Sequence, residues 1–534
     1  MNVQFRWVLG LAGLLLVGHV PAADRPNIVV FMVDDYDKSE SSVYGGKVLT
    51  PNLERLAREG ITFNNAHVTS TVCTPSRYTF LTGRYAGSSY YPEYLELFPP
   101  GQQALPGFNV GLEGDKMNVG ALLAQNSYAT GFVGKFHVGP SLSDPAFRAK
   151  YGLHDVRKNA PFTKILNRQQ FENEKGFRKA VQDYGFTWAK NIYWENTKAP
   201  FQSHNPEWTI EAAVDFIEEH HDKPFYLHYC TTLLHGPNGA WYKSLSQPEV
   251  TGEGLIPNGI EGVSTRASVM ERLEKAGLSS SEAGYLWMDD SLGFLLDKLD
   301  DLELSDNTVV LFVADHGSGN KGSLYKSKGT EVPCIMRWPR GMKAGIRSDE
   351  LIQNTDFVPT WFDLASVALP AKYRVDGISL MPLFKKPKVP VRDYVYAEIG
   401  AARSVKTKDY SYITLRYTAE QVRGVRDKSR GFIKSMTGLS GGVSRSIASH
   451  PDAYSADQLY DLREDPDALE NLASQQRHAS TLGVMRKLLE QELRRFPGRP
   501  YGEFVPTRTW TGEASYPDVF HALRQAAAAK KKKK

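Results

Sequence analysis

The sequence predicts an α/β sandwich built on a large, mostly parallel sheet between helices, followed by a smaller α+β subdomain with an antiparallel sheet. Four short apolar runs, at residues 28–33, 128–133, 225–230 and 309–314, predict buried strands. Near-continuous runs of this length, rich in Val, Ile and Phe, are typical of strands that are buried on both faces of a parallel sheet. Amphipathic helical stretches at 119–125, 209–220 and 285–299 precede three of these runs, and this alternation favours an α/β fold.

The pattern changes after about residue 385, where the smaller subdomain is expected to begin. Segments 394–399, 403–407 and 410–417 alternate polar with apolar or aromatic residues, as antiparallel strands with one solvated face do. An amphipathic helix is predicted at about 478–495. Because the stretch 385–390 is rich in Lys and Pro, we expect domains over residues 24–387 and 388–525.

The two ends of the chain differ in composition from the domains. Arg6 precedes the apolar run 8–17, and Pro21-Ala22-Ala23 offers a cleavage site, so residues 1–23 are predicted to be a secretory signal peptide. The run is too short to span a bilayer comfortably, which favours a secreted or periplasmic protein with no membrane anchor over an uncleaved anchor. Residues 526–534 form an Ala/Lys tail that we expect to be disordered.

The net charge of +4 comes largely from those ends. Lys530–Lys534 and Arg6 together contribute six positive charges, so the remaining body carries a net charge of −2. A nearly neutral body does not favour nucleic acid as a partner.

The three cysteines are too few for a disulfide framework in an exported protein of 534 residues. Cys230 and Cys334 lie in apolar segments and are predicted to be small core residues. Cys73 differs from both because it is surrounded by Thr, Pro, Ser and Arg residues.

Acidic residues follow the first and the last of the four predicted strands. Asp34 and Asp35 follow the first, and Asp315 and His316 follow the last. The carboxyl ends of parallel strands form the ligand crevice of such folds, so these side chains should converge. Asp can also cap a helix, but two adjacent carboxylates leaving a buried strand would repel each other unless a cation holds them. Together the four side chains predict a site for one divalent ion.

Basic side chains lie near the same strand ends. Lys135 and His137 are two residues apart and face the same way in an extended chain. His235 and Lys321 are ordinary loop residues when taken singly, but together with the first pair they place cationic groups around the metal site. Arg77 adds a planar guanidinium. Such a pocket suits a tetrahedral oxyanion, either sulfate or phosphate.

The segment around Cys73 carries a family motif. Cys73-Thr74-Pro75-Ser76-Arg77 continues into Leu81-Thr82-Gly83-Arg84, and it closely resembles the C-x-P-S-R and L-T-G-R patterns of the type I sulfatases in the alkaline phosphatase superfamily. The resemblance covers most of the chain. Its further segments lie at 26–35, 50–53, 60–63, 134–139, 234–237, 315–317, 332–333, 337–339, 459–462, 465–466 and 471–472.

The resemblance implies that a separate maturation enzyme oxidises Cys73 to Cα-formylglycine, also called 3-oxoalanine. One hydroxyl of the hydrated aldehyde would attack sulfur and displace the alcohol. The other hydroxyl would then lose a proton and expel sulfate, which regenerates the aldehyde. A thiol cannot eliminate sulfate in this way.

The resemblance also implies the metal ligands: Asp34, Asp35, Asp315, His316 and the modified Cys73, around one divalent cation that is usually Ca²⁺ in this family. His316 stands where many relatives have asparagine, and imidazole is a less natural ligand of Ca²⁺ than an amide oxygen. Either His316 binds the ion weakly or only steadies the site, or another divalent ion is used.

The remaining roles follow from the same resemblance. Arg77 and Lys135 would stabilise the formylglycine hydrate, and His137 would be the general base. His235 and Lys321 would lie against the sulfate and its bridging oxygen, with His235 as the acid for the leaving alcohol.

Three functions remain open on the sequence. The first is hydrolysis of a sulfate ester, on a sulfated carbohydrate that an exported enzyme would meet. The second is hydrolysis of a phosphodiester or phosphonate monoester at the same formylglycine site. The third is a non-catalytic glycan-binding relative, which is disfavoured because every expected catalytic position is present. The insertion at 87–115 and the aromatic-rich segment 184–208 are predicted either to line the substrate site or to pack in the core.

Overall fold

The computed structural model describes residues 25–236, 238–258, 266–416, 450, 452, 455–496 and 498–501. The predicted signal peptide at 1–23 and the Ala/Lys tail at 526–534 lie outside these residues. Within the described part, no helix is both long and apolar enough to span a membrane.

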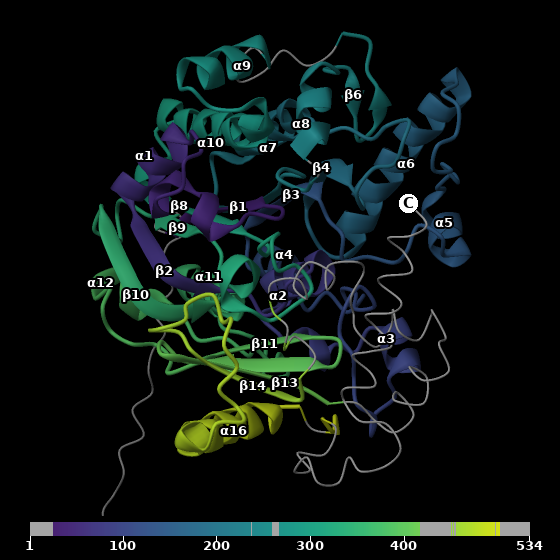
Figure 1. Cartoon of the computed structure of the whole chain (residues 1–534). Coiled ribbons are helices and arrows are strands. Elements are labelled where there is room, and N and C mark those ends of the chain that lie inside the picture. The colour runs from purple at the N-terminus through teal and green to yellow at the C-terminus, as the bar shows by residue number, and fades with distance from the viewer. Residues whose placement is uncertain are drawn as a thin grey trace, which may run out of the picture.

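A sheet of eight strands forms the centre of the molecule, in the order β10-β2-β9-β8-β1-β5-β3-β4 (Figure 1). Neighbouring strands run parallel except where β9 pairs antiparallel with β2 and β8. The predicted α/β class is therefore confirmed. The strands are β1 (Asn27–Val33), β2 (Ile61–His67), β3 (Ala129–Lys135), β4 (Trp188–Tyr193), β5 (Phe225–Cys230), β8 (Thr308–Ala314), β9 (Cys334–Arg337) and β10 (Ile346–Gln353).

The four strands predicted from the sequence are neighbours at the middle of this sheet. They lie in the order β8-β1-β5-β3, and every residue of each of them is buried. Their register brings their carboxyl ends level, because Val33 pairs with Ala314 and Gly134 pairs with Cys230. The polar residues that follow these strands therefore meet at one edge, as predicted.

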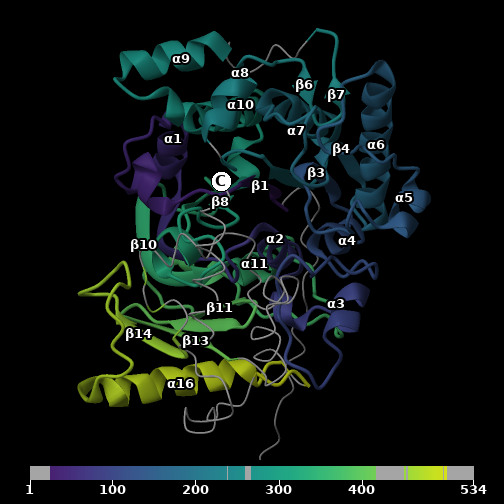
Figure 2. The same cartoon turned by 45° about the vertical axis from the view of Figure 1, so that its right-hand side comes forward.

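Helices cover both faces of the sheet (Figures 1 and 2). The helices α1 (Pro51–Glu59), α7 (Pro206–His220) and α10 (Ala283–Asp301) cover one face, and α2 (Cys73–Thr82), α4 (Val119–Ala124) and α11 (Phe357–Leu364) lie on the other. The helices predicted at 119–125, 209–220 and 285–299 correspond to α4, α7 and α10. Shorter or peripheral elements complete this part: α3 (Pro92–Leu97), α5 (Pro145–Tyr151), α6 (Lys164–Asp183), α8 (Asn238–Leu245), α9 (Arg266–Lys275), α12 (Met381–Lys385), β6 (Val250–Thr251) and β7 (Gly254–Leu255).

A second sheet is antiparallel, in the order β11-β12-β13-β14. Its strands are β11 (Val395–Ile399), β12 (Ala402–Lys406), β13 (Tyr410–Leu415) and β14 (Asp457–Asp461). The first three and the helix α16 (Ala479–Leu493) match the predicted elements, whereas β14 was not predicted as a strand. Figure 1 shows α16, in yellow, on the side of this sheet that faces away from the large sheet.

The opposite face of the second sheet supports the segment that leads into α2. Ile399 and Ile413 belong to a buried cluster with Val72, the residue before Cys73. The Glu398 backbone N–H also donates to the Thr69 carbonyl oxygen at 2.8 Å. The small sheet therefore fixes the backbone from which Cys73 projects.

The aromatic side chains of the segment 184–208 are mostly core residues. The exposed fractions of Tyr193, Trp194 and Trp208 are 1%, 3% and 1%, so these rings pack in the core, and Tyr193 and Trp194 also line a cavity. Cys230 and Cys334 are also buried, as predicted.

Buried hydrogen bonds fix the insertion at 87–115 against α2. The Glu113 carboxylate accepts hydrogen bonds from the Tyr78 hydroxyl at 3.0 Å and from the Arg84 guanidinium at 2.7 Å. Ser89 and the Tyr90 backbone N–H donate to the same carboxylate, each at 3.0 Å. Arg84, the last residue of the L-T-G-R stretch, thus helps to hold the insertion in place through its contact with Glu113.

Candidate active site

Cys73 is the first residue of α2 and lies at the centre of the charged strand ends. Its Sγ is 3.3 Å from His316 Nε2, 3.6 Å from Asp34 Oδ1 and from Lys135 Nζ, and 3.8 Å from Lys321 Nζ. The side chain is 1% exposed. Four of the side chains predicted to form the site are thus brought into direct contact with Cys73.

The surroundings of Cys73 favour negative charge at this position. Burial raises the pKa of the thiol, and so does the neighbouring Asp34 carboxylate. Lys135, Lys321 and His316 outweigh both and lower the pKa of Cys73 to about 6. A helix N-terminus adds to this preference because its unpaired N–H groups carry partial positive charge. The same groups can stabilise an oxyanion bound beside residue 73.

Arg77, one turn along α2, connects three strand ends. Its Nε donates to Asp315 Oδ2 at 3.0 Å, and one terminal nitrogen donates to the Lys135 carbonyl oxygen at 2.9 Å. The other terminal nitrogen lies 3.8 Å from Asp34 Oδ1, and it makes no hydrogen bond with the described residues. Arg77 is therefore buried with one terminal nitrogen that has no hydrogen-bond acceptor among the described residues.

Two lysines balance the charge of the paired carboxylates. Lys135 Nζ donates to Asp34 Oδ2, and Lys321 Nζ lies 2.8 and 2.9 Å from the two oxygens of Asp35. Burial alone would raise the pKa of Asp34, but Lys135 and Arg77 hold it well below its usual range. Burial also raises the pKa of Asp35, but His316 and Lys321 outweigh it and lower the pKa. Both carboxylates of the pair thus favour the ionised form that a cation requires.

The donor set fits a divalent cation. Asp34, Asp35, Cys73 and His316 each offer a buried ligand atom, and these atoms lie within 4.8 Å of one another. Burial lowers the pKa of His316, but Asp315, Cys73 and Asp35 outweigh it and raise the pKa to about 9. A bound cation would compete with that proton, because a ligating imidazole must be neutral.

Asp315 touches the cluster but is already hydrogen-bonded. Its Oδ1 accepts from the Asp35 backbone N–H at 3.2 Å, and its Oδ2 accepts from Arg77. Its Oδ1 also lies 3.7 Å from His316 Nε2. A role of Asp315 as a direct metal ligand stays a prediction.

His137 lies beside the cluster with an unusual backbone. Its φ is 53°, and its N–H donates to the Trp194 carbonyl oxygen at 3.0 Å. Burial, followed by Lys135 and Arg77, holds the pKa of the imidazole well below its usual range, so the ring is neutral and can accept a proton. Among the described residues, no hydrogen bond or ion pair joins the ring to Cys73.

His235 reaches the cluster from the loop after β5. Its Nε2 is 3.9 Å from Asp35 Oδ2 and 3.1 Å from Asn196 Nδ2. Its Nδ1 lies 3.1 Å from the Gly236 carbonyl oxygen. The imidazole is thus held between the carboxylate pair and the segment that follows β4.

Three residues of the site had no role assigned from the sequence. The Ser76 hydroxyl donates to the Asp315 carbonyl oxygen at 2.5 Å. Asp37 is buried and accepts from the backbone N–H of Ser318 at 2.7 Å and of Gly319 at 3.1 Å, which fixes the loop that carries Lys321. Asn196 contacts His235. Ser76 lies inside the cysteine motif and Asp37 close to the aspartate pair, but no sequence signal marks Asn196.

The fold and this site together are typical of hydrolases that act on esters of tetrahedral oxyanions. Residues 26–367 match the family model described as sulfatase. Residues 314–423 match a model described as the C-terminal region of N-sulphoglucosamine sulphohydrolase. The chain therefore belongs to the sulfatase family and is a sulfuric ester hydrolase, which confirms the resemblance seen in the sequence.

Individual relatives agree with this assignment. The chain is 26% identical over 467 residues to an ulvan-active sulfatase of Formosa agariphila, covering 85% of this chain and 76% of the relative. It is 27% identical over 418 residues to the N-acetylgalactosamine-6-sulfatase of Homo sapiens, covering 71% and 70%. A solved structure from work on the metabolism of multiple glycosaminoglycans by Bacteroides thetaiotaomicron superposes with a TM-score of 0.60 at 20% identity, covering 88% of this chain and all of that one.

Proposed function

We propose that this sulfatase removes sulfate from a carbohydrate, using a formylglycine made from Cys73 and one divalent cation, with Ca²⁺ as the expected ion. The observation that carries the proposal is the contact of Cys73 with Asp34, Lys135, His316 and Lys321. A cysteine that only packs in the core would not require two lysines and a carboxylate next to its sulfur.

The cation would be held by Asp34, Asp35, His316 and residue 73, with Asp315 beside them. A divalent cation in such a site stabilises charge on the sulfate oxygens and lowers the pKa of a nearby hydroxyl. The donors are mainly carboxylate oxygens, which Ca²⁺ prefers, and His316 is the one ligand that departs from that preference.

A formylglycine at position 73 supplies, as its hydrate, a hydroxyl nucleophile and a second hydroxyl whose deprotonation releases sulfate. Making it would require a separate maturation enzyme. Arg77 has a free donor and Lys135 lies at the Cys73 sulfur, so both would orient the hydrate. Lys321, between Asp35 and Cys73, would bind a sulfate oxygen.

The two histidines would move the protons. His137 has a depressed pKa, which suits a base that accepts a proton from a hydroxyl of residue 73. His235 would donate a proton to the bridging oxygen as the alcohol leaves. The amide nitrogen of Asn196, which lies 3.1 Å from His235 Nε2, would hold the ring in position.

A carbohydrate substrate is supported by the names of the relatives, one active on ulvan and one on N-acetylgalactosamine 6-sulfate groups. Cleavage of a signal peptide near Ala22-Ala23 would place the enzyme in the periplasm or outside the cell, where sulfated polymers occur. We further propose that residues 24–387 form the catalytic domain and 388–525 the subdomain that supports it.

The test compares the bonds that the enzyme cleaves. The purified protein should hydrolyse p-nitrophenyl sulfate with a kcat/KM at least about tenfold above that for bis-p-nitrophenyl phosphate. Both esters release the same p-nitrophenolate, so the comparison isolates the oxyanion that the site prefers. A higher value for the phosphodiester would replace the proposal by the phosphodiesterase or phosphonate-hydrolase alternative.

A further inference from the structure

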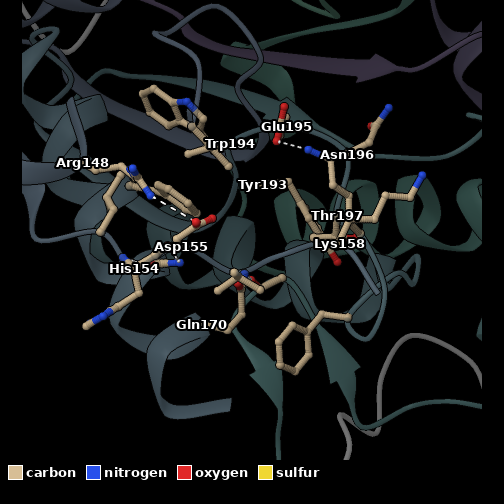
Figure 3. A pocket seen from close by; sticks show the side chains of 18 of the residues that line it. Arg148, His154, Asp155, Lys158, Gln170, Tyr193, Trp194, Glu195, Asn196 and Thr197 are labelled. Atoms are coloured by element: carbon tan, nitrogen blue, oxygen red, sulfur yellow. Dashed lines mark hydrogen bonds and ion pairs between the residues drawn. The ribbon is translucent and has the colours of Figure 1, made fainter. Parts of the chain in front are cut away.

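A cavity of about 390 Å³ lies beside the candidate active site. Its wall combines the loop and helix at 141–158, the face of α6 that carries Gln170, the end of β4 with the segment that follows it (192–198), and Gly252. Figure 3 shows the polar side chains from these segments around it. The volume is in the range of small-ligand sites, which is about 300–1,000 Å³.

The segment after β4 connects this cavity to both candidate catalytic histidines. Asn196 lines the cavity, and its Nδ2 is 3.1 Å from His235 Nε2. Trp194, which also lines it, accepts the His137 N–H through its carbonyl oxygen at 3.0 Å. A molecule in the cavity would therefore lie against the same backbone that positions the reacting groups.

The cavity carries excess positive charge. Arg148, Arg157, Lys158 and Lys198 line it together with the carboxylates Asp155 and Glu195. Asp155 lies 3.6 Å from Arg148 and 3.8 Å from Arg157, and the pair with Arg148 is drawn in Figure 3. Glu195 lies 2.9 Å from Lys198.

Lys158 is the lysine of this wall that is left without a carboxylate. Its side chain is exposed, and within the described residues it makes no ion pair. Two carboxylates among four cationic side chains leave the wall with a net charge of +2, although the body of the protein as a whole is close to neutral. This charge attracts anions.

We propose that this cavity binds a second, anionic sugar of an oligosaccharide whose sulfated neighbour is held at His235. The amide nitrogens of Asn196 and Gln170 contact His235 and Gly252, so their amide oxygens can accept hydrogen bonds from sugar hydroxyls. The basic side chains can bind a sulfate or a carboxylate on the second sugar. The inference rests on the proposed function and narrows the class of substrates that it covers. The preferred substrate is an oligosaccharide with anionic groups on two linked sugars.

The test measures competitive inhibition of p-nitrophenyl sulfate hydrolysis by matched pairs of sugars. Tetrasaccharides of chondroitin sulfate, heparan sulfate and carrageenan are each compared with the sulfated monosaccharide that they contain. For at least one pair, the tetrasaccharide should have an inhibition constant about tenfold below that of the monosaccharide. Lys158→Glu should remove that advantage, and added salt should weaken it in the wild type.

The matched control is Lys175→Glu, because Lys175 is exposed on α6, contacts the Phe171 ring and does not line the cavity. This variant should keep the tetrasaccharide advantage. Equal inhibition constants in every pair, or an advantage that Lys158→Glu leaves intact, would overturn the inference while aryl sulfate turnover still supports the proposed function. Absence of aryl sulfate turnover in the wild type would overturn both.

Discussion

Cys73→Ala is expected to lower kcat for p-nitrophenyl sulfate by more than about 10⁴-fold, because it removes the atom from which the nucleophile is made. Replacing this small buried side chain by Ala should leave the fold intact, because the contacts of Arg77 and Ser76 that anchor α2 do not involve the Cys73 sulfur. The measurement is steady-state turnover, with the melting temperature recorded for each variant.

Cys334→Ala is the matched control. Cys334 is also a buried, unpaired cysteine, but it lies in β9 within the main core. This variant should lose some stability and keep its turnover. If Cys73→Ala retained turnover within about tenfold of the wild type, residue 73 would not supply the nucleophile.

Asp34→Asn is expected to lower kcat/KM by about 100-fold or more, and to weaken binding of the divalent cation. The change removes one of two adjacent carboxylate charges and leaves Lys135 and Arg77 without the anion that both approach. Calorimetric titration with Ca²⁺ measures the affinity, and chelation of the wild-type enzyme followed by addition of Ca²⁺ should abolish and restore turnover.

The control for this prediction is Asp306→Asn, because Asp306 is an exposed residue that pairs with Arg340 and precedes β8, at the opposite end of that strand from Asp315. It should change neither Ca²⁺ affinity nor turnover. If Asp34→Asn bound Ca²⁺ as tightly as the wild type, the aspartate pair would not be the cation site.

The sequence predicted the middle of the sheet better than its edges. The central strands are buried on both faces, so their composition alone marks them. The strands β2, β4, β9 and β10 were missed. Three of them have polar positions: Asn64 and Asn65 in β2, Lys190 in β4 and the run from Arg347 to Glu350 in β10. Polar residues at partly solvated positions break the apolar run on which the prediction depended. The strand β9 is buried but only four residues long.

The residues of the site that the sequence predicted follow a buried strand or lie in the cysteine motif, whereas Asn196 carries no such signal. The contacts between the residues of the site could not be predicted from the sequence. Lys321 is 286 residues from Asp35 yet contacts both of its oxygens, and Asn196 meets His235 only because the ends of β4 and β5 both flank β3. Such contacts depend on strand order, which no local pattern specifies.

Mass spectrometry of the peptide that contains residue 73, taken from active enzyme produced with its maturation enzyme, tests the central claim most directly. The account predicts a peptide in which one oxygen replaces the sulfur and two hydrogens are missing, the composition of formylglycine. The fraction of modified peptide should rise in proportion to kcat across preparations. Fully active protein with an unmodified Cys73 would contradict the account.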